Sequence, residues 1–239
     1  MTRGDAGSPI RAGGIIAAGE GSRLKRDGWS VPKPLVEVAG APLVEHVIRN
    51  FEAAGITSVA VIFNEEEEDC AAFVRSRFSR LDLNVLLRTT PSSLVSFFEI
   101  MRIGAPGRLL VSTVDAFVPL DDFRAFVGIA EKLDENAVVL GVTPFVADEK
   151  PLRARIDADG RIRTLGGSEG DVVTAGLYVI PERLRGMRLP PLPRLRDFLR
   201  SLVESGETVF GVPIRKVVDV DRAEDVALAE EMSRWPCDS

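Results

Sequence analysis

Short runs of apolar, often β-branched residues alternate along the first two thirds of the chain with segments of helical periodicity. The apolar runs predict strands, and the segments in which apolar residues recur every three or four positions predict helices. We place strands at 14–18, 58–63, 84–87, 108–112 and 137–142, and helices at 43–54, 66–78, 93–103 and 120–133. This alternation is typical of βαβ crossovers, in which helices cover a mainly parallel sheet.

The rhythm changes in the last third. Runs at 153–157 and 161–165 flank a turn at Ala158-Asp159-Gly160 and predict a β-hairpin. Further strands are expected at 172–180, 208–212 and 216–218, and helices at 195–205 and 222–233. The sequence therefore predicts a single-domain, Rossmann-like α/β fold with a mainly parallel but mixed sheet, flanking helices and a small β-hairpin insertion in the second half.

Composition narrows the classes of function. The chain has 239 residues and a formal net charge of −6, so we expect no nucleic-acid partner, which would need a basic face. No long apolar run predicts a membrane span, and residues 1–12 are expected to be a disordered leader before a domain at 13–239. The two cysteines, Cys70 and Cys237, form no metal-ligand or disulfide pattern, which fits a cytoplasmic location.

A glycine-rich turn follows the first predicted strand, in Ala17-Ala18-Gly19-Glu20-Gly21-Ser22-Arg23-Leu24. Ligands bind at the carboxyl ends of strands in open α/β sheets, and glycines let backbone N–H groups approach phosphate oxygens. Arg23 could donate to a phosphate, and Lys33, in Pro32-Lys33-Pro34-Leu35, supplies a second cation. The segment fits neither the Walker A pattern nor the dinucleotide fingerprint.

Carboxylates follow two other predicted strands. Asp115 comes just after the strand at 108–112, and Asp219 and Asp221 come after the short strand near the carboxyl end. Mg²⁺ prefers oxygen ligands and is commonly shared between one or two carboxylates and substrate phosphates. Asp115 is our first metal ligand. For the second we choose Asp219 before Asp221, because Asp221 could instead cap the next helix with Glu224 as its capping-box partner, and the choice stays open.

Two segments together resemble the sugar-phosphate nucleotidyltransferases: IIAAGEGSRL at 15–24 and VPKPLVEVAGAPLVEHVI at 31–48. The resemblance implies a GT-A-like nucleotidyltransferase fold, with a nucleotide-binding part at about 13–143 and an acceptor-binding part at about 144–221. It implies an Mg²⁺-dependent enzyme whose partners are an NTP and a phosphorylated small molecule. Arg23 and Lys33 would be catalytic, and the nucleotide would contact Ala17, Ala18, Gly19, Glu20, Gly21 and Ser22.

Other parts of the family pattern are altered. Thr89-Thr90-Pro91-Ser92-Ser93-Leu94 stands where the family has GTA, and we expect Thr90, Ser92 and Ser93 at the nucleotide, although helix capping is their commoner role. Thr174 and Gly176 lie in a segment similar to the family's NAGIY strand and are expected to bind the acceptor. The EKP motif is replaced by Gly166–Asp171, so Lys216 is the expected substitute cation, with Arg153 second.

These observations leave three interpretations open. The leading one is transfer of a nucleoside monophosphate to a sugar 1-phosphate or similar acceptor, with release of pyrophosphate. The second is a cytidylyltransferase of the molybdopterin or terpenoid-precursor type on the same fold, and the third is a nucleotide-binding regulatory protein that has lost catalysis. The sequence identifies neither the base nor the acceptor, and it leaves oligomerisation open.

Overall fold

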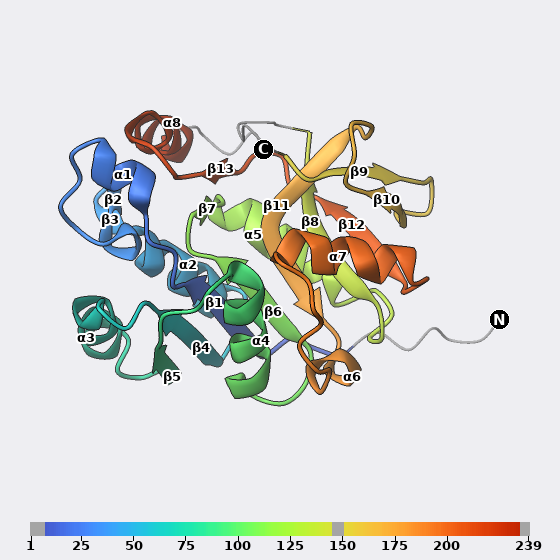
Figure 1. The fold of residues 1–239 in the computed structure, drawn as a ribbon, viewed down its shortest axis with the longest axis horizontal. Helices are drawn as coiled ribbons and strands as arrows, with labels where there is room; N and C mark the ends of the chain where they lie inside the picture. Colours follow the sequence, from blue (N-terminus) through green and yellow to red (C-terminus); the bar gives the residue numbers. More distant parts are fainter. Residues whose placement is uncertain (1–7, 145–150, 235–239) are drawn as a thin grey trace.

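A single mixed sheet organises the computed structural model, which describes residues 8–144 and 151–234 (Figure 1). Nine strands form this sheet within the described residues. Four of them run parallel in the order β5 (Asp82–Leu87), β4 (Ser58–Phe63), β1 (Ala12–Ala17) and β6 (Leu109–Thr113). The predicted parallel core is confirmed, and its central strand β1 ends at the glycine-rich turn.

The second half of the sheet is antiparallel where it joins the first. Strand β11 (Val172–Ile180) runs antiparallel to β6 and to β8 (Val138–Thr143), and β12 (Val209–Pro213) pairs in parallel with β8. The predicted hairpin is β9 (Arg153–Ile156) and β10 (Ile162–Leu165), attached to the start of β11. The sheet is therefore mixed, as its strand pattern predicts.

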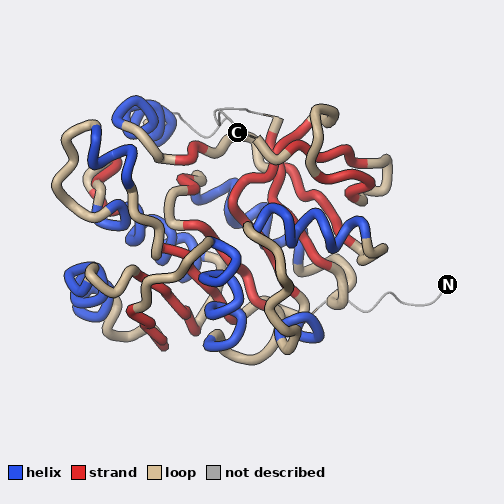
Figure 2. The backbone as a smooth tube through the Cα atoms, viewed as in Figure 1, coloured by secondary structure: helices blue, strands red, loops and turns tan. Residues whose placement is uncertain are grey.

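Helices cover both faces of the sheet (Figure 2). One apolar cluster contains buried residues of α2 (Leu43–Ala53), α3 (Glu68–Arg77), α5 (Leu120–Ala130) and α8 (Ala223–Ser233). The opposite cluster contains those of α4 (Ser93–Ile103), α6 (Glu182–Arg185) and α7 (Leu195–Glu204). Alternate side chains of β1 enter different clusters, Ile15 the first and Ile16 the second, because successive strand residues point to opposite faces.

Two glycines in β1 allow helices to pack closely on both faces. A Cβ atom at Gly13 would lie 2.5 Å from the ring of Phe51 in α2. A Cβ atom at Gly14 would lie 2.3 Å from Ile100 Cγ2 in α4. Any side chain here would push a helix away from the strand, so these glycines fix the position of β1 and of the turn that follows it.

The main elements agree with the sequence prediction to within a few residues, and the differences are local. The leader was expected to reach residue 12, but Ile10 is fully buried and its N–H donates to Glu131 Oε1 at 2.9 Å. Ile10 therefore packs with the folded part, and residues 1–7 of the expected leader lie outside the described residues. No described helix combines the length and the apolar character needed to cross a membrane.

Candidate functional site

The turn after β1 contains two glycines that meet different requirements. Gly21 has a φ of +57° and precedes the short helix α1 (Ser22–Arg26), and a Cβ atom there would lie 2.9 Å from Lys33 Cβ. Position 21 therefore needs glycine both for its backbone conformation and for its contact with Lys33. Gly19 has open space where a Cβ atom would project. A ligand is free to approach the backbone at Gly19.

The site's carboxylates are brought together by a two-stranded ladder. Strand β7 (Ala116–Phe117) pairs antiparallel with β13 (Val218–Asp219), and Asp219 lies opposite Ala116. The Val220 N–H donates to the carbonyl oxygen of Asp115 at 2.9 Å. The ladder therefore places the segment from Asp219 to Asp221 beside Asp115.

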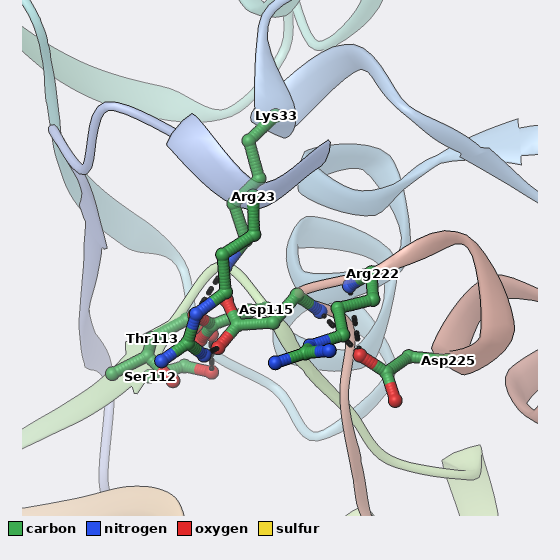
Figure 3. A network of polar contacts seen from close by, with 8 residues as sticks. Arg23, Lys33, Ser112, Thr113, Asp115, Arg222 and Asp225 are labelled. Carbon is green, nitrogen blue, oxygen red and sulfur yellow. Dashed lines mark hydrogen bonds and ion pairs between the residues drawn. The ribbon is translucent and has the colours of Figure 1, made fainter. Parts of the chain in front are cut away.

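Lys33 connects the predicted catalytic and metal-binding residues. Its Nζ lies 2.7 Å from Asp115 Oδ2 and 2.5 Å from Asp221 Oδ1. Arg23 Nη1 donates to the other oxygen of Asp221, Oδ2, at 2.6 Å. Figure 3 shows Arg23 and Lys33 pointing toward the end of β6, where Thr113 and Asp115 lie. Four side chains that the sequence singled out therefore form one network.

Burial and charge act in opposite directions on the pKa values of this network. Burial alone would lower the pKa of Lys33, whose side chain is only 8% exposed, but the charges of Asp115 and Asp221 raise that pKa above its usual value. Burial alone would raise the pKa of Asp115, and the Lys33 charge outweighs it and lowers that pKa. Both groups are therefore charged at neutral pH, and each charge depends on its partner.

Asp221 does not have the capping role that the sequence offered as an alternative to metal binding. Helix α8 has Arg222 as its N-cap residue, one position later than predicted. The capping carboxylate is Asp225, whose Oδ2 accepts from the N–H groups of Asp221 at 2.9 Å and Arg222 at 2.8 Å. A carboxylate in the first turn of the helix binds the N–H groups that lack helical partners, which leaves the Asp221 side chain for Lys33 and Arg23.

A cavity of about 340 Å³ opens on the side of the glycine turn. Among the residues that line it are Ala18, Gly19, Glu20, Lys33, Thr90, Ser92, Ser93, Thr113 and Asp115. Ser92 also caps α4, because its Oγ accepts from the Val95 N–H at 3.4 Å. Thr90 Oγ1 lies 2.6 Å from Ser96 Oγ. Capping and cavity lining therefore coexist at this helix start.

A second cavity, of about 250 Å³, opens on the other side of Asp115. Its lining includes Arg23, Thr113, Asp115, Thr174, Gly176, Tyr178, Arg196, Asp219, Asp221 and Arg222. Gly176 has a φ of +69°, and a Cβ atom there would lie 2.7 Å from both Thr113 Oγ1 and Ala116 Cβ. Glycine at 176 is therefore required by its positive φ and by close packing against the segment from Thr113 to Ala116.

Some predicted residues lie outside the two cavities, and some lining residues were missed. Ala17, Gly21, Ser22, Arg153 and Lys216 are not among the residues that line either cavity. Arg196, in the first turn of α7, lines the second cavity and had no motif to identify it. Tyr178 lines it too, and burial, followed by the charges of Asp219 and Asp115, raises the pKa of its hydroxyl. The pairing of β11 with β6 brings Tyr178 opposite Val111.

The donor set fits a magnesium ion. Carboxylate oxygens of Asp115 and Asp221 both contact Lys33 Nζ, so these two side chains face the same place and would be the residues to hold a small cation there. Mg²⁺ takes oxygen ligands and usually completes its shell with water and substrate phosphates. No group of three or more His, Cys, Asp or Glu side chains is gathered for metal binding in the described residues, so phosphates would have to supply further ligands.

The sequence is similar to those of several known proteins. The chain is 30% identical to the bifunctional protein GlmU of Bartonella bacilliformis over 165 residues, 69% of this chain and 28% of that protein. It is 28% identical to the bifunctional IPC transferase and DIPP synthase of Rubrobacter xylanophilus over 232 residues, 91% of this chain and 51% of that protein. The chain thus spans about half or less of these curated relatives.

The fold has a close counterpart among solved structures. The inositol-1-phosphate CTP transferase from T. maritima superposes with a TM-score of 0.80 at 18% identity, covering 97% of this chain and 100% of that one. At this identity the likeness concerns the fold. The sequence pattern of one protein family, the MobA-like NTP transferase domain, matches residues 13–168. These residues include the glycine turn, Lys33 and Asp115. By that match the chain belongs to the MobA-like NTP transferase family, a family of nucleotidyltransferases.

Proposed function

We propose that the chain transfers a nucleoside monophosphate from an NTP to a phosphorylated small-molecule acceptor and releases pyrophosphate. One observation carries the proposal: two cavities, lined by different elements, share Thr113 and Asp115. A reaction that joins two ligands needs two adjoining pockets and a charged group at their boundary. The NTP would occupy the cavity beside Gly19, and the acceptor the cavity beside Gly176.

Different residues of the site would position the two ligands and neutralise the charge of their phosphates. Gly19 and Glu20 would lie along the nucleotide, and the Lys33 ammonium would bind its phosphates. An oxygen of the acceptor phosphate would attack the α-phosphorus, and the bond from that phosphorus to the β-phosphate oxygen would break, so that pyrophosphate leaves. Such a displacement depends on placing the groups and balancing their negative charge, and it needs no covalent nucleophile.

Magnesium dependence is part of the proposal. Asp115 and Asp221 would hold the ion, with Asp219, in the same loop, as an alternative second carboxylate. When bound, the ion supplies positive charge to the phosphates. Arg23 would help keep the Asp221 carboxylate in place, because its guanidinium holds the oxygen that faces away from Lys33.

The acceptor is expected to be a phosphorylated sugar or polyol. Arg23, Arg196 and Arg222 line the second cavity and would bind the phosphate of an anionic acceptor. The hydroxyl groups of Thr174 and Tyr178 also line it and would form hydrogen bonds with the acceptor's hydroxyl groups. CTP with inositol 1-phosphate is the first pair to test, because the superposed T. maritima enzyme carries that description. A sugar 1-phosphate with UTP or dTTP is the second, and molybdopterin-type or terpenoid-precursor acceptors with CTP follow.

A two-stage screen tests the proposal. The four NTPs and dTTP are first compared by thermal shift with MgCl₂, and the best nucleotide is then incubated with each acceptor while pyrophosphate is measured. We expect one pair to release pyrophosphate, with loss of release in EDTA. Full release in EDTA would contradict the metal dependence. Nucleotide binding with no release for any acceptor would instead favour the regulatory protein that has lost catalysis.

A further inference from the structure

We propose that Lys33 and the metal ion compete for the Asp115 and Asp221 carboxylates, so that the metal is bound at this pair only when nucleotide phosphates take over the ammonium group. The inference rests on the proposed function, since it uses the same site and the same ligands. It adds an order of events: the nucleotide, or its metal complex, must arrive before the carboxylates can hold the ion.

The contacts of Lys33 carry the argument. Its ammonium group donates to Asp115 Oδ2 at 2.7 Å and to Asp221 Oδ1 at 2.5 Å, which places one cation between the two oxygens. A cation held by both carboxylates would have to occupy the place between them, where the ammonium group lies. A divalent ion and an ammonium group repel each other strongly at such close range, so the two cations exclude one another.

The base of the Lys33 side chain is held, so only its outer part can move. Pro32 and Pro34 flank it in the short helix η1 (Lys33–Leu35), and its Cβ packs under the backbone of Gly21. Lys33 also lines the cavity beside Gly19, on the nucleotide side of Asp115. A rotation of the outer side chain would carry the ammonium from the carboxylates to phosphates bound in that cavity.

The balance of charge favours this exchange only when phosphates are present. Lys33 and Arg23 neutralise Asp115 and Asp221 within the network, so removing the ammonium would leave an uncompensated carboxylate at a partly buried position. A triphosphate offers Lys33 a replacement partner and offers the metal additional oxygen ligands. One ligand therefore satisfies both cations, which explains why two carboxylates and two basic side chains are gathered here.

Metal binding to the nucleotide-free protein tests the proposal directly. Mn²⁺ serves as the probe, and its bound fraction is measured by electron paramagnetic resonance on the full chain. We expect Lys33→Gln to bind Mn²⁺ at least tenfold more tightly than the wild-type protein. Lys25→Gln is the matched control, because Lys25 is exposed in the neighbouring helix α1 and its loss changes the net charge equally. We expect its affinity to stay within twofold of wild type.

Two outcomes of that titration would overturn the proposal. One is a wild-type affinity for Mn²⁺ equal to that of Lys33→Gln, and the other is an equal gain in Lys25→Gln, which would show a general effect of net charge. Pyrophosphate release is measured separately. If transfer occurs but the affinities are equal, the competition fails and the proposed function stands. If Lys33→Gln gains affinity but the wild-type protein transfers nothing to any acceptor, the competition stands and the proposed function fails.

A second measurement uses the wild-type protein alone. The chain has five lysines, so the ammonium signal of Lys33 can be resolved after ¹⁵N-lysine labelling. Adding Mg²⁺ without nucleotide should leave this signal unchanged. Adding NTP in EDTA should shift it. A shift with Mg²⁺ alone would contradict the competition, whether or not the variant folds.

Discussion

The two cavities on either side of Asp115 are built differently. The cavity that we propose for the nucleotide is lined largely by the turn after β1 and by the start of α4, with small and hydroxyl side chains and few charges. The cavity that we propose for the acceptor is lined by charged groups from distant parts of the chain: Arg23, Asp115, Arg196, Asp219, Asp221, Arg222, Glu224 and Asp225. The first cavity suits the nucleotide, a ligand that a whole family of enzymes binds. The second suits the acceptor, which the protein must distinguish from similar molecules.

Asp115→Asn tests whether the carboxylate at the boundary between the two cavities takes part in the reaction. We expect this variant to have the largest effect on turnover. Asp115 is proposed to hold the magnesium ion, whose positive charge would act on the reacting phosphates, and loss of such stabilisation costs on the order of 10²–10³ in kcat. Asparagine keeps the shape and can still accept from Lys33, which also retains Asp221. Pyrophosphate release and thermal melting are measured together, with the exposed turn variant Asp159→Asn as the control. A loss of stability that accounts for the loss of rate would contradict the assignment.

Lys33→Ala tests the nucleotide side. The ammonium is expected to act on the phosphates more strongly in the transition state than in the ground state, so kcat should fall about 10²-fold and NTP binding should weaken. Lys33→Arg should restore the activity only in part, because the planar guanidinium has a different geometry from the compact ammonium. Steady-state kinetics with varied NTP provide the measurement. Full kcat and full affinity in Lys33→Ala would make the Pro32–Leu35 segment a structural loop.

Two glycine variants compare the cavities through stability. Gly176→Ala places a methyl group against Thr113 and Ala116 at a positive φ, and such backbone strain costs about 1–3 kcal/mol. Gly19→Ala meets no atom within 4 Å and should leave stability unchanged while raising the KM for NTP. Urea denaturation and kinetics separate the two results. Unchanged NTP kinetics in Gly19→Ala would mean that no ligand approaches the backbone there.

Glu207→Gln gives the smallest expected effect and lies outside both cavities. The hydrogen bond from Arg183 lowers the pKa of Glu207 below its usual 4.5. A lowered folded-state pKa contributes stability above the usual value, and this contribution is lost as the pH falls through the folded pKa. The variant should therefore lose a little stability at neutral pH and show a flatter decline below pH 4.5. Melting curves between about pH 3 and pH 7 measure this, and unchanged turnover is the control.

The nucleotide side could be predicted because its chemistry lies in short contiguous segments. The turn at 17–24 and the segment around Lys33 are each set by local backbone requirements, such as the positive φ of Gly21. Strand ends also fix where Asp115 must lie. Even here the sequence did not show that Lys33 would contact both Asp115 and Asp221, because that contact joins three separate segments.

The acceptor side could be predicted only in part. Gly176 and Asp219 stand in recognisable segments, but Arg196 reaches the cavity only because α7 packs on the face of the sheet opposite α8. The cap of α8 was misassigned for a similar reason. Asp221 has the right residue type for a cap, yet the contacts with Lys33 and Arg23 hold its side chain and Asp225 caps instead. Long-range packing decided the first case, and long-range ion pairs decided the second.

The central claim is that the site transfers a nucleotidyl group between two ligands that meet at Asp115. The most direct test incubates the protein with Mg²⁺, the acceptor found by screening, and the selected NTP labelled at either the α- or the γ-phosphate. We predict that α-label enters an acidic product in equal amount to the pyrophosphate released, and that γ-label appears only in pyrophosphate. Transfer of γ-label to the acceptor would show a kinase reaction and contradict the account.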